Sequence, residues 1–166
     1  MEIRPAKIRP YDAKDAVLLA NLYVQSVKAI GPCHYSSLQV EAWLSLRPSA
    51  ERIHRSGTDG RTRLVAVDGS DQPVAFADLK NDGHIEFLYC SPEMARAGVA
   101  SALYDELGRI AWERGMTQLY SEASEAARRL FLQKGFTVIA RRQFEISGVE
   151  IHNYAMEKAL RNEETG

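Results

Sequence analysis

The chain has 166 residues, 45% of them hydrophobic and 26% charged, which is typical of a soluble globular protein with a sizeable core. Its net charge of -1 gives no support for a nucleic-acid or membrane-surface partner. Cys33 and Cys90 lack metal-ligand spacing, and the sequence contains neither a signal-peptide core nor a membrane-length apolar run, so we expect a metal-free cytoplasmic protein.

The N-terminal half is predicted to contain one short strand, a group of helices and a three-stranded meander. Asp12, Ser36 or Ser37, and Ser49 are suited to cap the helices, because their side chains can accept hydrogen bonds from free first-turn N–H groups. Turn residues such as Asp82-Gly83 separate strands that we expect to be antiparallel. The predicted ranges are 7–9 (strand), 12–30 and 38–46 (helices), 49–55 (helical turn), and 63–67, 73–79 and 84–90 (strands).

The stretch 84–112 is the most informative part of the chain. It is predicted to form a strand, a loop of small residues and a helix, because Pro92 stops the strand and helical spacing begins after Gly98. Free N–H groups at the start of that helix, together with the helix dipole, favour a bound anion, so the loop has the outline of a phosphate site. A lone glycine between strand and helix is also typical of a plain αL turn. Side chains alternate along a strand. The residues expected to share one strand face are His84, Glu86, Leu88 and Cys90.

The C-terminal part is predicted to add a strand, a helix and two further strands. Ser124 is suited to cap the helix, and Ser147-Gly148 forms the turn between the last two strands. The predicted ranges are 118–121 (a buried strand), 124–133 (helix), and 137–144 and 149–158 (strands), with 161–166 a frayed tail. We therefore expect one α/β domain over residues 1–166.

Two motifs of the chain resemble the GCN5-related N-acetyltransferase (GNAT) superfamily. The loop 95–100, ARAGVA, is similar to the family pattern Gln/Arg-x-x-Gly-x-Gly/Ala, and the segment 124–136 is similar to its Asn-x-x-Ala motif that ends in Gly-Phe. The resemblance covers nearly the whole chain in element order. It implies the GNAT acyl-CoA N-acyltransferase fold, with a central mixed, mostly antiparallel sheet flanked by helices. It also implies direct acetyl transfer from acetyl-CoA to an amine of a small molecule or peptide.

The resemblance also implies which residues contact acetyl-CoA. N–H groups of 96–101 would hold the diphosphate, and the edge of 88–90 would pair with pantetheine amides and polarise the thioester. The implied cofactor-binding residues are Leu88, Tyr89, Cys90, Ala95, Arg96, Ala97, Gly98, Val99, Ala100, Ser101, Ser124, Ala127 and Phe131.

Three residues depart from the family motifs. Ala95 stands where Gln or Arg is usual, so one diphosphate donor is missing, and the neighbouring Arg96 is the expected substitute. Ser124 replaces the usual Asn near the pantetheine arm. Phe131 lies where many members carry the tyrosine that protonates the leaving thiolate, so the usual general acid is absent.

The transfer needs a group that removes a proton from the amine. Glu86 and His84 are the candidate bases, and we expect Glu86→Gln to lower turnover more than cofactor binding. Tyr154 and Tyr120 are the candidate general acids. A thiolate is a weak enough base to leave without a general acid. We expect Cys90 to be a small core residue, because a covalent acyl-enzyme would need a His–Asp pair beside it.

The acceptor region is expected between the first two helices, where the family covers its acceptor site. His34, Tyr35 and Trp43 are the candidate substrate-binding residues there. Two other functions stay open: a non-catalytic CoA-binding regulatory module, and an acyltransferase that uses a longer acyl-CoA or a hydroxyl acceptor. A homodimer also stays open, because dimerisation is common in the superfamily.

Overall fold

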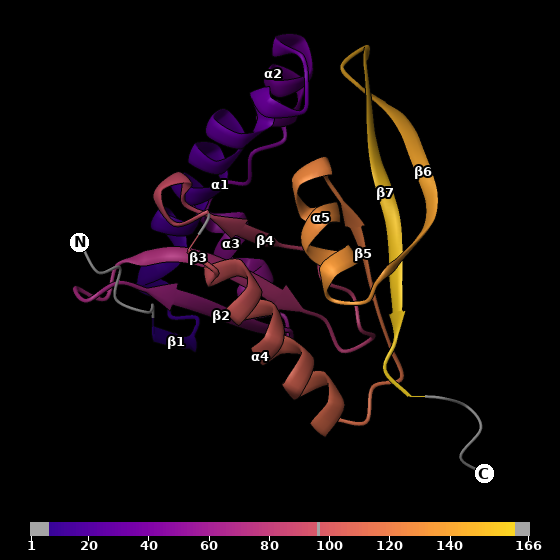
Figure 1. The fold of residues 1–166 in the computed structure, drawn as a ribbon. Coiled ribbons are helices and arrows are strands. Elements are labelled where there is room, and N and C mark those ends of the chain that lie inside the picture. The colour runs from indigo at the N-terminus through magenta and orange to yellow at the C-terminus, as the bar shows by residue number, and fades with distance from the viewer. Residues whose placement is uncertain (1–6, 96, 162–166) are drawn as a thin grey trace.

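The computed structural model describes residues 7–95 and 97–161 as two antiparallel sheets with helices on their faces (Figure 1). The order of elements predicted from the sequence is confirmed. The strands are β1 (Lys7–Pro10), β2 (Thr62–Val67), β3 (Pro73–Leu79), β4 (Leu88–Cys90), β5 (Gln118–Ala123), β6 (Thr137–Ile146) and β7 (Val149–Ala159). The helices are α1 (Ala16–Ile30), α2 (Ser37–Ser45), α3 (Ala50–Gly57), α4 (Val99–Glu113) and α5 (Glu125–Gln133), with short 3-10 helices η1 (Ala13–Asp15), η2 (Gly31–Cys33) and η3 (Pro92–Met94).

The two sheets diverge from a narrow contact between them. The first has the order β1-β2-β3-β4 and the second β5-β7-β6, and all their strand pairs are antiparallel. One isolated parallel bridge, His84↔Tyr120, connects them. The mixed, mostly antiparallel fold expected from the sequence is therefore confirmed. Among the described strands β4 pairs with β3 alone, so its second edge is left available.

Helices cover both faces of the first sheet (Figure 1). Helix α4 buries Leu103 and Leu107 against β3 residues such as Ala77. Helices α1 and α3 bury Leu19 and Ile53 on the opposite face. Burying each such side chain contributes about 1.5–3 kcal/mol, so these contacts fix the positions of α1 and α4 on either side of β4. None of the helices within the described ranges is long and apolar enough to cross a membrane.

The strand predicted over 84–90 is wrong in its first half. The Asp78 N–H donates to the Phe87 carbonyl at 3.0 Å, whereas the Lys80 N–H donates to the His84 carbonyl at 2.9 Å, so one extra residue is inserted as in a bulge. The Ile85 N–H donates instead to the Tyr120 carbonyl on β5. Ile85 consequently packs in the cluster that contains Cys90, and the expected alternation between faces fails before Phe87.

The strand predicted over 118–121 extends further and is only half buried. Strand β5 runs to Ala123 and buries alternate residues, with Leu119 inside and Gln118 and Glu122 exposed. One of its faces contacts the core and the other contacts solvent, which explains this pattern. The predicted serine caps are confirmed: Ser36 accepts from Gln39 N–H, and Ser49 and Ser124 make the equivalent contacts on their helices. Asp12 caps η1, which precedes α1, by accepting from the Lys14 N–H.

Candidate functional site

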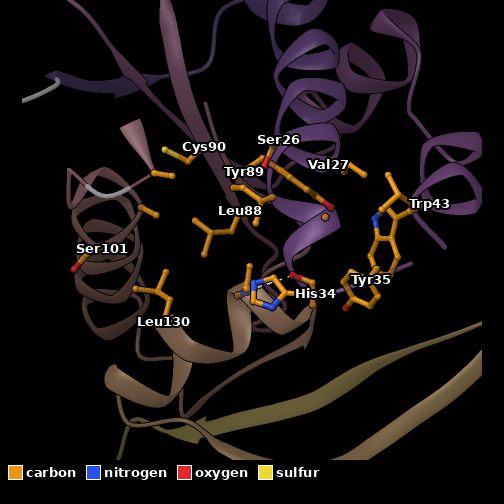
Figure 2. A pocket seen from close by; sticks show the side chains of 18 of the residues that line it. Ser26, Val27, His34, Tyr35, Trp43, Leu88, Tyr89, Cys90, Ser101 and Leu130 are labelled. Atoms are coloured by element: carbon orange, nitrogen blue, oxygen red, sulfur yellow. Dashed lines mark hydrogen bonds between the residues drawn. The ribbon is translucent and has the colours of Figure 1, made fainter. Parts of the chain in front are cut away.

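A cavity of about 350 Å³ lies along the edge of β4 that does not pair with β3, between α1, α2, α4 and α5 (Figure 2). Its lining residues are Ser26, Val27, Ile30, Gly31, His34, Tyr35, Gln39, Val40, Trp43, Leu88, Tyr89, Cys90, Ala95, Gly98, Ala100, Ser101, Ser124, Ala126, Ala127, Leu130 and Gln133. The residues from 88 onward form one half, which we call the loop half. Residues from α1 through α2 form the other, which we call the aromatic half.

The β4 edge supplies peptide groups to the cavity. Two residues that flank β4 hydrogen-bond toward β3. The Phe87 carbonyl accepts from the Asp78 N–H, and the Ser91 N–H donates to the Val74 carbonyl. Because peptide directions alternate along a strand, the N–H and C=O groups of Leu88 and Cys90 point to the opposite edge. Leu88, Tyr89 and Cys90, the cofactor-binding residues predicted on this strand, all line the cavity.

The start of α4, beside the free edge of β4, has the backbone geometry of an anion-binding site. Gly98 is the N-cap residue with φ of 77°, and as a glycine it has no side chain to cap the helix. Its first-turn N–H groups are therefore available to a ligand, and the helix dipole favours an anion there. Ala95, Gly98, Ala100 and Ser101 line the cavity, so small side chains leave this backbone accessible.

Four predicted cofactor residues are not part of the described lining. Ala97 is exposed outside the cavity, and Val99 is buried in the core below α4. Phe131 is 1% exposed and packs on Phe136 at 4.7 Å between ring centroids. Arg96 lies outside the described residues.

Helix α5 forms the opposite wall of the loop half. Ser124 Oγ accepts from the Ala127 N–H at 3.3 Å, so the residue that replaces the family asparagine serves as the helix cap. Ala126, Ala127 and Leu130 line the cavity. The sequence prediction missed Leu130, although its spacing of three residues from Ala127 is the signal that puts both on one helix face.

The aromatic half brings together the three residues predicted to bind the acceptor. Tyr35 and Trp43 have ring centroids 5.6 Å apart, and His34 lies within the space bounded by Leu88, Leu130 and Tyr35 (Figure 2). Val27 and Ile30 of α1 also line this half, so apolar side chains of this helix form part of the cavity wall.

Burial keeps the phenol and thiol groups at β4 protonated. It raises the pKa of Tyr23 to about 12 and of Cys90 to about 11, and it raises the pKa of Tyr89 further still. Tyr23 and Tyr89 pack together with ring centroids 4.8 Å apart. A protonated, buried thiol is a poor nucleophile, which agrees with the expectation of Cys90 as a core residue.

Glu86 and His84, the predicted bases, lie outside the cavity lining. Glu86 is 2.8 Å from Lys80 Nζ and 3.5 Å from Arg61 Nη1. Burial favours its protonated form, but these two cations outweigh burial and lower the pKa of Glu86. His84 Nε2 lies 2.6 Å from Glu122 Oε2, and its ring stacks on Tyr120.

Tyr154, the predicted acid, belongs to a separate cluster at the start of α5. Its hydroxyl donates to Glu125 Oε1 at 2.7 Å, which raises the pKa of Tyr154, and His152 Nε2 lies 2.7 Å from the same oxygen. Tyr35 accepts from the Glu125 N–H at 3.1 Å and donates to the His152 carbonyl at 3.3 Å. Tyr35 therefore connects the aromatic half to α5 and β7.

This cluster predicts a pH-dependent contribution to stability. Burial favours protonated Glu125, but the hydrogen bonds from Tyr154 and His152 outweigh it and lower the pKa of Glu125 to about 2. Its unfolded pKa is about 4.3, so the contribution is complete above that pH and is lost as the pH falls toward the folded value. The unfolding free energy lost in Glu125→Gln should be larger near pH 7 than near pH 3, by urea denaturation. An equal loss at both pH values would contradict this.

Comparison with known proteins matches most of the chain to one family. Residues 33–158 match the family model described as acetyltransferase (GNAT) domain. The Escherichia coli (strain K12) protein described as uncharacterized N-acetyltransferase YafP is 29% identical over 152 residues, covering 90% of this chain and 93% of the relative.

Solved structures agree in fold over nearly the whole chain. A GCN5-related N-acetyltransferase from Rhodopseudomonas palustris is 31% identical, with a TM-score of 0.86, and the match covers 96% of this chain and 99% of the other. PaiA N-acetyltransferase from Thermoplasma acidophilum, solved with coenzyme A, is 22% identical, with a TM-score of 0.70 and coverage of 92% and 98%. With a family model matched over most of its length, the chain belongs to the GNAT acetyltransferase family.

Proposed function

We propose that the protein transfers the acetyl group of acetyl-CoA directly to an amine of a small molecule or peptide. One observation carries the proposal: a single cavity joins an unpaired strand edge and an uncapped helix start to an aromatic half. The coenzyme A complex of the Thermoplasma acidophilum relative, which shares the fold, supports this use of the site.

The loop half is suited to hold acetyl-CoA through backbone groups. The first-turn N–H groups after Gly98 would bind the diphosphate, and the helix dipole would add attraction for its charge. The outward peptide groups of Leu88 and Cys90 would pair with pantetheine amides and polarise the thioester carbonyl. Because these donors belong to the backbone, the changes at Ala95 and Ser124 leave them in place.

His34 is the residue that we propose as the base. Among the described lining residues it is the one histidine, the residue type that most often serves as a general base, whereas burial raises the pKa of Tyr35, Tyr89 and Cys90 there. In the proposed step the amine nitrogen bonds to the acetyl carbon, the C–S bond breaks with its electron pair on sulfur, and the amine proton passes to His34. The thiolate needs no strong acid, which is consistent with Phe131 buried in the core.

Replacing His34 by glutamine should lower kcat/KM at neutral pH by about a hundredfold, the usual effect of losing a general base. The Kd for acetyl-CoA should stay within about twofold, because that cofactor would bind in the loop half. The acidic limb of the pH–rate profile, which reports protonation of the base, should disappear in the variant. Steady-state thiol release across pH and calorimetric titration measure these quantities.

Glu86→Gln is the matched comparison, because it also replaces an ionisable group by an amide. With the base at His34, this variant should keep most of its turnover. Full activity of His34→Gln beside a strong loss in Glu86→Gln would instead assign the base to Glu86.

A calorimetric titration with acetyl-CoA tests the cofactor half of the proposal. We expect saturable binding with one site per chain. Tight binding without transfer to any amine would favour the regulatory module, and tighter binding of longer acyl-CoA thioesters would favour the other acyltransferase. No binding would contradict the assignment of the loop half to coenzyme A.

A further inference from the structure

We infer that the acceptor is a primary amine whose only charge is its ammonium group and whose remaining body is apolar. This inference rests on the proposed acetyl transfer and narrows the substrate class of the same site. It follows from what the aromatic half contains and from how its few polar groups are already engaged.

The described residues of the aromatic half include no Asp, Glu, Lys or Arg among the cavity lining. Its largest surfaces are the rings of Tyr35 and Trp43, with Val27, Ile30 and Val40 beside them. Such a wall stabilises a bound ligand by removing its apolar surface from water, and it offers no ion-pair partner to a second charge on that ligand.

Two polar groups near the aromatic half are already bonded within the protein. Gln39 donates from Nε2 to the Glu150 carbonyl at 2.9 Å, and its Oε1 accepts from the Ser36 N–H at 2.9 Å. Glu125, whose N–H contacts Tyr35, has its carboxylate bonded to Tyr154 and His152. A second ammonium would have to compete with these partners for either group.

A second charge on the acceptor would therefore lose water without gaining a partner. Burying an unpaired charged group costs several kcal/mol even after partial compensation, which is more than the gain from an extra methylene. Polyamines, aminoglycosides and amino acids each carry such a charge close to the reacting amine. The cavity should select against all three classes.

Matched amines test this on the unmodified protein. Hexylamine and phenethylamine should release thiol from acetyl-CoA with kcat/KM at least about tenfold above that of diaminohexane and aminohexanoate, which add one ammonium or one carboxylate to the same chain. Equal or better use of diaminohexane or aminohexanoate would overturn the inference. If acetyl-CoA binds but no amine releases thiol, the proposed transfer fails and this inference fails with it.

A charge placed in the wall should weaken or remove the preference. Val27→Glu adds a carboxylate to the lining of α1, and it should lower the ratio of kcat/KM for hexylamine over diaminohexane by about tenfold or more. Gln25→Glu adds the same charge at an exposed position of the same helix and should leave the ratio unchanged. A folded Val27→Glu protein with an unchanged ratio would contradict the placement of the acceptor, and the amine series decides independently of whether this variant folds.

Discussion

Gly98→Asp should raise the Kd for acetyl-CoA by at least about a hundredfold, because it sets a carboxylate against the proposed diphosphate site. Gly98 is the N-cap residue of α4 with a φ of 77°, and a Cβ added at this position would meet nothing within 4 Å among the described residues. Aspartate is among the residues that best tolerate this backbone conformation. The loss should therefore come from charge at the ligand rather than from misfolding, and calorimetric titration measures it.

Two variants separate charge from shape at this glycine. Gly98→Asn has the same size without the charge and should bind far better than Gly98→Asp. Gly148→Asp makes the same substitution at a φ of 82°, also with nothing within 4 Å, in the distant turn between β6 and β7, and it should bind normally. Unchanged acetyl-CoA affinity in folded Gly98→Asp would refute the diphosphate site at α4.

Asp78→Asn should destabilise the protein by about 3–5 kcal/mol, the usual result of breaking a buried ion pair from one side. Asp78 and Arg63 have fully buried side chains and form two hydrogen bonds, from Nε at 2.7 Å and from Nη2 at 2.8 Å. Arg61 Nη1 adds a third at 3.0 Å and also faces Glu86. Removing the charge of Asp78 would leave the buried Arg63 guanidinium without a carboxylate partner among the described residues, whereas Arg61 keeps Asp59 and Glu86. The expected loss is large against a total stability of about 5–15 kcal/mol.

An exposed ion pair supplies the control for this prediction. Lys134 lies 2.8 Å from Asp105, whose side chain is 62% exposed, so Asp105→Asn should cost less than about 1 kcal/mol. Urea denaturation followed by circular dichroism compares the two variants. An equal cost in both would show that the buried pair contributes no more than a surface pair.

Local signals in the sequence predicted most of the fold. The serine caps and the glycine turns act within four residues, so each helix start could be recognised without knowledge of its neighbours. The segment 84–87 could not be predicted in the same way. Its path is determined by the hydrogen bond from Ile85 to Tyr120, a residue far along the chain, and this contact overrides the alternation that a single strand would show.

The sequence located the candidate cavity where its lining depends on the path of the backbone. Gly98 and the residues of β4 are found by sequence motifs because the motif encodes the turn and the strand edge. Side-chain roles were harder to assign, because Leu130 and Phe131 are adjacent apolar residues and only packing decides which one faces the cavity. Likewise, the absence of charge from the described aromatic half depends on segments that meet only after folding.

Thiol release from acetyl-CoA in the presence of hexylamine, with the product identified by mass spectrometry, tests the central claim most directly. We predict stoichiometric formation of N-acetylhexylamine and free coenzyme A, with His34→Gln strongly impaired at neutral pH and able to bind acetyl-CoA. Saturating acetyl-CoA binding with no acetylated product from hexylamine or phenethylamine would contradict the proposed transfer to an apolar amine.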